Sequence, residues 1–111
     1  MTDFDEQTYQ KIAGLLPPER LSVHLGSFER QLRECFRDPS DVEGMKNAAH
    51  KLISQAGMPG FVELSARCGD LEAACEGDRP VPPALAALRA SADTALERLA
   101  QLKDRSRDGP G

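Results

Sequence analysis

Residues 48–72 of this chain read AAHKLISQAGMPGFVELSARCGDLE. In the first half, apolar and small side chains recur at helical spacing, which places His50 outside the apolar arc, about 120° from its middle. The Gly-Met-Pro-Gly sequence of residues 57–60 predicts a break. From Phe61 onward an apolar side chain returns every three or four residues, which predicts a second helix. The stretch therefore predicts two helices separated by a turn, with an outward-facing histidine on the first.

The same periodicity predicts helices on both sides of this stretch. We expect five helices, at about residues 3–16, 18–36, 40–57, 61–76 and 83–103. Pro17 and Pro18 end the first helix, because proline cannot continue the hydrogen-bond ladder. The weak apolar edge of that helix comprises Ile12, Leu15 and Leu16, with Phe4 and Tyr9 as further candidates.

The third helix, which bears His50, should begin with Ser40 or Asp41 as its N-cap residue. Its apolar arc comprises Val42, Met45, Ala49, Leu52 and Ala56. Four long helices with short connections bury such stripes most simply as an antiparallel, up-and-down four-helix bundle. We therefore expect an all-α domain over residues 1–104, with the short first helix capping one end and residues 105–111 forming a flexible tail.

Composition narrows the class of protein. The net charge of −4 and the lack of a basic stripe argue against nucleic-acid binding. No apolar run is long enough to span a bilayer, and the acidic N-terminus is unlike a secretory leader. Cys35, Cys68 and Cys75 are odd in number and include no CxxC pair, which is typical of reduced thiols in the cytosol. We expect a cytoplasmic protein, and a monomer because its apolar stripes can all be satisfied internally.

Eight positions of the central stretch resemble the signature of histidine-containing phosphotransfer (HPt) domains. They are Ala49, His50, Leu52, Gly60, Leu64, Cys68, Leu71 and Glu72. The resemblance implies a phosphocarrier of a multistep phosphorelay that has no kinase activity of its own. His50 would accept a phosphoryl group from a receiver-domain aspartate and pass it to another receiver. The implied partners are receiver domains of response regulators or hybrid histidine kinases, which would bring the Mg²⁺, so that this chain needs no cofactor.

Residues near His50 are expected to support the transfer. Lys46 lies one turn before His50 on the same side, whereas Lys51 points about 100° away; either could offset the charge of a phosphoryl group. The resemblance places Glu72 near the same face, where it would orient or solvate the imidazole. Receiver docking is expected at Glu43, Asn47, Ile53, Ser54 and Gly57.

The central stretch departs from the family pattern in one place. A Lys commonly stands three residues after the histidine and a Gly four residues after it, and this chain has Ile53 and Ser54 there. Our hypothesis is that Lys46 compensates for the missing Lys. The departure favours an alternative function, a non-phosphorylated adaptor that binds and regulates a receiver domain or kinase. A third interpretation, a metal-binding bundle that uses His24, His50 and the cysteines, has poor ligand spacing.

Overall fold

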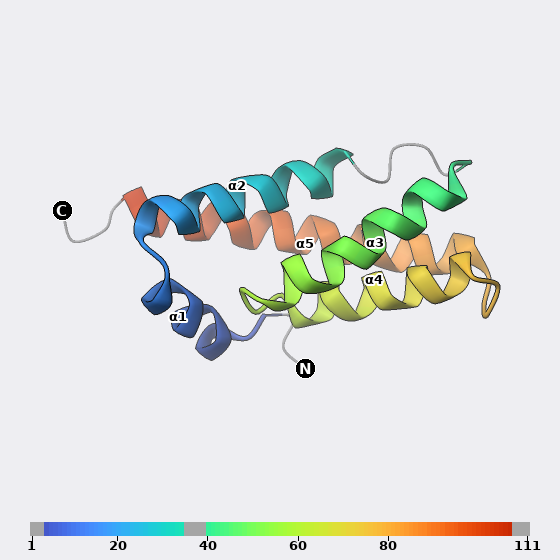
Figure 1. Ribbon diagram of the computed structural model, residues 1–111, viewed down its shortest axis with the longest axis horizontal. Helices are drawn as coiled ribbons and strands as arrows, with labels where there is room; N and C mark the ends of the chain where they lie inside the picture. The colour runs from blue at the N-terminus through green and yellow to red at the C-terminus, as the bar shows by residue number, and fades with distance from the viewer. Residues whose placement is uncertain (1–3, 35–39, 108–111) are drawn as a thin grey trace.

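The computed structural model describes residues 4–34 and 40–107, and within these ranges it contains five helices and no strand (Figure 1). The helices are α1 (Glu6–Leu15), α2 (Pro18–Glu34), α3 (Val42–Gly57), α4 (Val62–Cys75) and α5 (Val81–Arg107). The expected all-α class is confirmed. Cys35, the expected end of the second helix and residues 108–111 of the expected tail lie outside the described residues.

Helix α5 is longer than the sequence predicted. It begins at Val81 and contains Pro82 and Pro83 in its first turn. First-turn residues have no intrahelical acceptor for their N–H groups, so proline is tolerated there. The helix ends at Arg107, so residues 105–107 are helical and not part of a tail. Their polar composition carries no helical periodicity, so this extension of α5 could not be predicted from the apolar pattern.

Side-chain carboxylates cap the N-termini of α1 and α3. Asp5 accepts a hydrogen bond from the backbone N–H of Gln7 at 3.1 Å, and Asp41 accepts one from Gly44 at 2.9 Å. Each bond satisfies a donor that the first turn of a helix leaves unpaired. Of the two expected caps for α3, the structure therefore selects Asp41 over Ser40.

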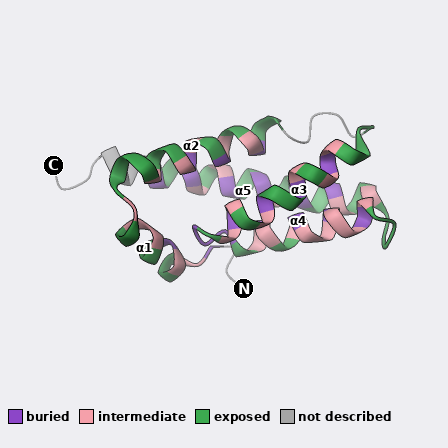
Figure 2. Cartoon of the chain, in the orientation of Figure 1, coloured by how far each residue is buried: buried purple, intermediate pink, exposed green. Residues whose placement is uncertain are grey.

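One hydrophobic core joins the helices, and buried residues face inward along them (Figure 2). Its largest fully buried apolar side chains include Phe28, Phe61, Met45, Leu52, Leu64, Leu71, Leu88, Leu99 and Leu102. Two expected core residues are exposed instead. Val42, the first residue of α3, is 42% exposed, and Leu15 is 78% exposed. Helix α1 buries Tyr9, and Leu15 lies about 120° from Tyr9 around the helix, so Leu15 is turned away from the core.

The helices α3 and α4 form the most closely packed pair, and α4 in turn packs along α5. Helix α2 contacts α5 and α3, and α1 contacts α2 at one end of the molecule. In the view of Figure 1, α2 and α4 run from left to right, whereas α3 and α5 run from right to left. The central stretch of the sequence therefore forms the tightest helix pair of the fold.

The turn between α3 and α4 anchors the N-terminal segment. The N–H of Asp5 donates to the carbonyl of Gly60 at 2.7 Å, and the Phe4 ring lies 4.9 Å from the Phe61 ring, centroid to centroid. Gly60 has φ +103°, and a Cβ there would stand 2.4 Å from the backbone oxygen of Asp5. Glycine is therefore required at this position both by the backbone conformation and by the close approach of the N-terminal segment.

Candidate functional site

His50 projects from the middle of α3 into solvent. Its side chain is 73% exposed, while Ala49 and Leu52 beside it are fully buried. The helix therefore fixes the backbone of His50 through its buried face and leaves the imidazole accessible to another protein. This is the outward orientation that the sequence predicted.

Glu72 of α4 holds the imidazole. Its Oε2 lies 2.7 Å from Nδ1 of His50, and its side chain is 22% exposed. The neighbouring Leu71 is fully buried and fixes this turn of α4 against the core. Because a carboxylate can only accept, Nδ1 carries the proton in this contact. The lone pair of the neutral ring is then on Nε2, the nitrogen that Glu72 does not contact.

Small residues let α3 and α4 pack closely about two turns after His50. A Cβ on Gly57 would stand 3.4 Å from Oγ of Ser65, and that hydroxyl donates to the carbonyl of Ile53 at 2.8 Å. Ile53 is partly buried against the core. Gly57 and Ile53 thus take part in helix packing, whereas Glu43, Asn47 and Ser54 of the expected docking set are exposed.

Ser65 was not among the residues singled out from the sequence. It precedes Glu72 by seven residues, so the two lie on the same face of α4. This spacing was available in the sequence and could have identified Ser65 as a helix-pairing residue. Its partner, the carbonyl of Ile53, could not be identified without the tertiary structure.

Lys46 also lies on the side of α3 that faces α4. Burial raises the pKa of the Cys75 thiol, and the charge of Lys46 opposes this rise while Glu43 adds to it. Cys75 follows Glu72 by three residues on α4, which places Lys46 one turn along the helix pair from the contact between His50 and Glu72. Lys51 is exposed.

A comparison with protein-family models matches residues 19–106 to the family described as the Hpt domain. The match covers most of the chain and begins within α2. The chain belongs to the Hpt domain family. Hpt domains carry phosphoryl groups in phosphorelays and are not kinases. The comparisons with curated proteins and with solved structures give no match.

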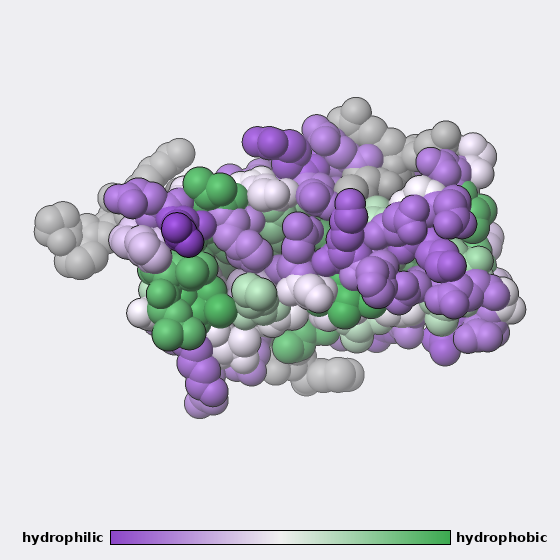
Figure 3. All heavy atoms as spheres, in the orientation of Figure 1, coloured by the Kyte–Doolittle hydropathy of each residue, from purple (hydrophilic) through white to green (hydrophobic). Residues whose placement is uncertain are grey.

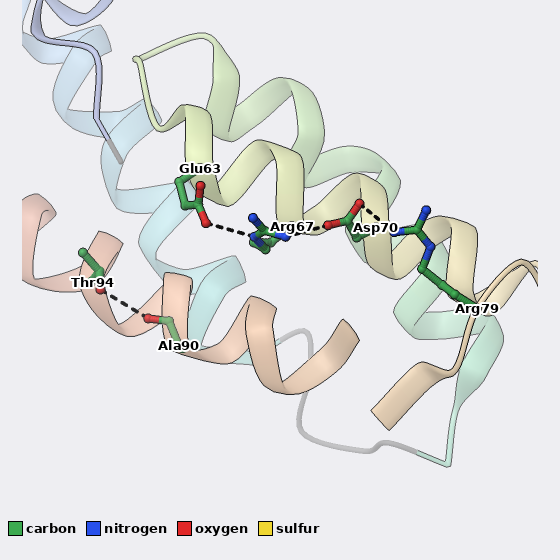
Figure 4. Close-up of polar contacts among 6 residues, drawn as sticks. All are labelled: Glu63, Arg67, Asp70, Arg79, Ala90 and Thr94. Atoms are coloured by element: carbon green, nitrogen blue, oxygen red, sulfur yellow. Dashed lines mark hydrogen bonds and ion pairs between the residues drawn. The ribbon is translucent and has the colours of Figure 1, made fainter. Parts of the chain in front are cut away.

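A separate set of charged side chains of this Hpt domain, on α4 and in the α4–α5 connection, lies away from His50. A chain of ion pairs on α4 links Glu63 to Arg67 at 2.9 Å and Arg67 to Asp70 at 2.8 Å, and continues to Arg79 at 3.2 Å (Figure 4). Glu63 precedes Glu72 by nine residues, which is about 180° around the helix. This network therefore lies on the side of α4 opposite Glu72. Its last ion pair, between Asp70 and Arg79, joins the α4–α5 connection to α4.

The third interpretation required His24, His50 and the cysteines to come together. Within the described residues, no group of three or more His, Cys, Asp or Glu side chains is placed to hold a metal ion. His24 lines a hollow beside α1 and has its Nε2 buried, and Cys68 is fully buried. None of the described helices is both long enough and apolar enough to cross a membrane.

Proposed function

We propose that this Hpt domain accepts a phosphoryl group on Nε2 of His50 from the aspartyl phosphate of a receiver domain, and passes it to the aspartate of another receiver. The observation that carries the proposal is the 73% exposed imidazole whose Nδ1 lies 2.7 Å from Glu72. In-line transfer needs an accessible nucleophile with a fixed lone pair. The contact with Glu72 supplies the fixed direction.

In the forward step, the Nε2 lone pair attacks phosphorus, a P–N bond forms and the P–O bond to the receiver aspartate breaks. The aspartate leaves as a carboxylate, so no proton has to move. The phosphorylated ring keeps its Nδ1 proton and carries a positive charge, which the carboxylate of Glu72 stabilises at hydrogen-bond distance. The reverse sequence delivers the phosphoryl group to the second receiver.

The positive charge that offsets the phosphoryl group is proposed to come from both proteins. Lys46 is proposed to offset part of the phosphoryl charge, in place of the Lys that Ile53 replaces. Mg²⁺ is proposed to come with the receiver. Glu43, Asn47 and Ser54, all exposed on α3, are proposed to contact the receiver around His50.

We also propose that α2, α3, α4 and α5 form an antiparallel, up-and-down four-helix bundle, with α1 as an addition at one end. The alternating helix directions in Figure 1 support this topology, as does the single core that the helices share. Such a bundle gives His50 a rigid base, because α3 is buried between two neighbours along its apolar arc.

The test is transfer from a panel of receiver domains labelled with [³²P]acetyl phosphate, with His50→Gln as the control. We expect acid-labile, alkali-stable label on the wild-type chain and none on His50→Gln, with equal helicity by circular dichroism. A chain that binds receivers without acquiring label would instead be the non-phosphorylated adaptor. Loss of folding in His50→Gln would mean that the histidine is structural.

A further inference from the structure

The α3–α4 pair carries a second polar contact besides the one between His50 and Glu72. Oγ of Ser65, on α4, donates to the backbone carbonyl of Ile53 on α3 at 2.8 Å. A Cβ built on Gly57 would stand 3.4 Å from the same oxygen. The Ser65 side chain therefore lies against α3 at two points, a carbonyl and a glycine. Because it binds a backbone atom, this contact positions the main chain of α3 and not only a side chain.

The two contacts stand in the same register of the helix pair. On α3, His50 precedes Gly57 by seven residues, and on α4, which runs the other way, Glu72 follows Ser65 by seven (Figure 1). Seven residues are about two turns, or about 10.5 Å, on each helix. A slide of α4 along α3 that breaks the contact at Ser65 would therefore also move Glu72 relative to His50.

A directional contact is needed to hold this register. Apolar burial between α3 and α4 has no preferred direction, whereas a hydrogen bond weakens steeply when its geometry is lost. The surface over α3 is mostly hydrophilic (Figure 3). On α4, a Cβ on Gly69, between Ser65 and Glu72, would meet nothing within 4 Å. Neither the surface nor this glycine aligns the helices, whereas the hydrogen bond from Ser65 can.

The contact at His50 depends on that alignment. Oε2 of Glu72 lies 2.7 Å from Nδ1 of a mostly exposed ring. A displacement of about 1 Å would take the two atoms out of hydrogen-bond range. The ring would then populate both tautomers, and the lone pair on Nε2 would no longer have a fixed direction. Misplacement of this size is known to slow reactions whose groups must be aligned.

We propose that Ser65 is a positioning residue of the phosphotransfer site, which sets the register of α4 on α3 and so brings Glu72 to Nδ1 of His50. The inference rests on the proposed function and deepens it. Ser65 acts through Glu72 and not by contact with the phosphoryl group. It therefore controls the rate of transfer once the receiver is bound, and not the affinity for the receiver.

The test separates the hydroxyl of Ser65 from its shape. Thr and Val are both β-branched and similar in shape and helix propensity, so Ser65→Thr keeps the donor and Ser65→Val removes it. Ser65→Ala removes the donor without adding volume, and it takes the place of Ser65→Val if that variant does not fold. Thermal melting checks the fold of each chain.

Thr94→Val is the matched control. Oγ1 of Thr94 also donates to a backbone carbonyl, that of Ala90 at 3.3 Å, but within α5 and away from the site (Figure 4). This variant removes the same kind of hydrogen bond without touching the α3–α4 pair.

Three quantities are measured for each chain. The ¹⁵N shifts of the imidazole report the tautomer of His50 and need no phosphoryl donor. The transfer rate is measured from a ³²P-labelled receiver at saturating concentration. Titration calorimetry gives the affinity for the same receiver.

We expect Ser65→Val and Ser65→Ala to move the ¹⁵N shifts toward a mixture of tautomers. Transfer should slow by about fivefold, the equilibrium ratio that corresponds to one neutral hydrogen bond. Receiver affinity should not change, and Ser65→Thr and Thr94→Val should match the wild type. Wild-type shifts and rates in Ser65→Val would overturn the inference, as would equal slowing by Ser65→Thr and Ser65→Val. Weaker receiver binding with an unchanged rate at saturation would also overturn it.

A double variant shows whether Ser65 acts through Glu72. In the Glu72→Ala background, Ser65→Val should cause no further slowing, because the contact that it positions is already gone. Additive losses would mean that Ser65 affects transfer by another route, and the inference would be wrong.

These measurements separate the inference from the proposed function. A tautomer shift in Ser65→Val, without label on His50 from any donor, would retain the positioning role and refute the phosphocarrier. Label on His50 at rates that do not depend on Ser65 would do the reverse.

Discussion

Glu72 Oε2 lies 2.7 Å from Nδ1 of His50, although the two residues stand 22 positions apart on different helices. The contact joins α3 to α4 at the reactive ring and decides which nitrogen holds the proton. It therefore links the packing of the helix pair directly to the chemistry proposed for His50.

Glu72→Ala should slow transfer to and from His50 by about ten- to hundredfold, the range of one charge-assisted hydrogen bond. The transfer rate of Glu72→Gln should lie between those of the wild type and Glu72→Ala, because the amide oxygen still accepts from Nδ1 but carries no charge. The ¹⁵N shifts of the imidazole should move toward the Nε2–H tautomer in Glu72→Ala. Wild-type shifts and rates in that variant would exclude an orienting role.

Lys46→Ala should shorten the lifetime of phosphohistidine and reduce transfer by several-fold, because a partly exposed charge contributes about 1 kcal/mol or less. Lys51→Ala, on the exposed side of α3, is the matched control and should leave both quantities unchanged. The lifetime is measured by loss of acid-labile label after the donor is removed. Equal effects of the two changes would contradict the compensation by Lys46.

Gly60 and Gly69 should respond oppositely to alanine. Gly60→Ala forces a side chain into φ +103° and against the Asp5 carbonyl, so we expect a loss of roughly 2 kcal/mol or more in unfolding free energy. A Cβ on Gly69 meets nothing within 4 Å, so Gly69→Ala should gain about 0.5–1 kcal/mol from helix propensity. Urea denaturation measures both; a stabilising Gly60→Ala would show that the N-terminal segment is not anchored there.

Glu29 should make stability depend on pH. Its hydrogen bond from Lys103 of α5, with a further one from Arg33, holds the pKa of the Glu29 carboxyl below its usual value. The contact therefore stabilises the fold above the usual carboxyl pKa and is lost as the pH falls through the lowered pKa.

Glu29→Gln should accordingly reduce the unfolding free energy at pH 7 and have little effect at pH 2–3, as urea denaturation at the two pH values would measure. Glu34→Gln, on the same helix and exposed, is the control and should change neither. An equal loss from Glu29→Gln at both pH values would mean that its contribution is packing and not charge.

Leu52→Ala and Leu71→Ala should each cost about 2–5 kcal/mol, because both leucines are fully buried in the α3–α4 pair. They flank the site residues His50 and Glu72, so the remaining folded fraction should still accept label. Thermal melting gives the stability change. A loss below about 1 kcal/mol would show that this part of the core is loosely packed.

The sequence by itself determined the helices and the outward direction of His50. Apolar spacing of three and four residues sets which side of a helix must avoid water, and this holds whatever the helix packs against. The same spacing failed for Leu15 and Val42, because local periodicity cannot tell which of two apolar edges finds a partner. At α1 the neighbouring aromatic rings settled the choice in favour of Tyr9.

Only the tertiary structure decided the relationships between elements. Three features each join residues from different helices. They are the contact between His50 and Glu72, the close approach of Gly57 to Ser65, and the hollow lined by Leu16, Val23 and Met58. Their geometry depends on how far apart the helices lie and how they are rotated, which follows from the packing of the whole core. The pattern of apolar residues in a sequence shows which face of each helix is buried, but not which helix packs against that face. The proposed chemistry depends on both.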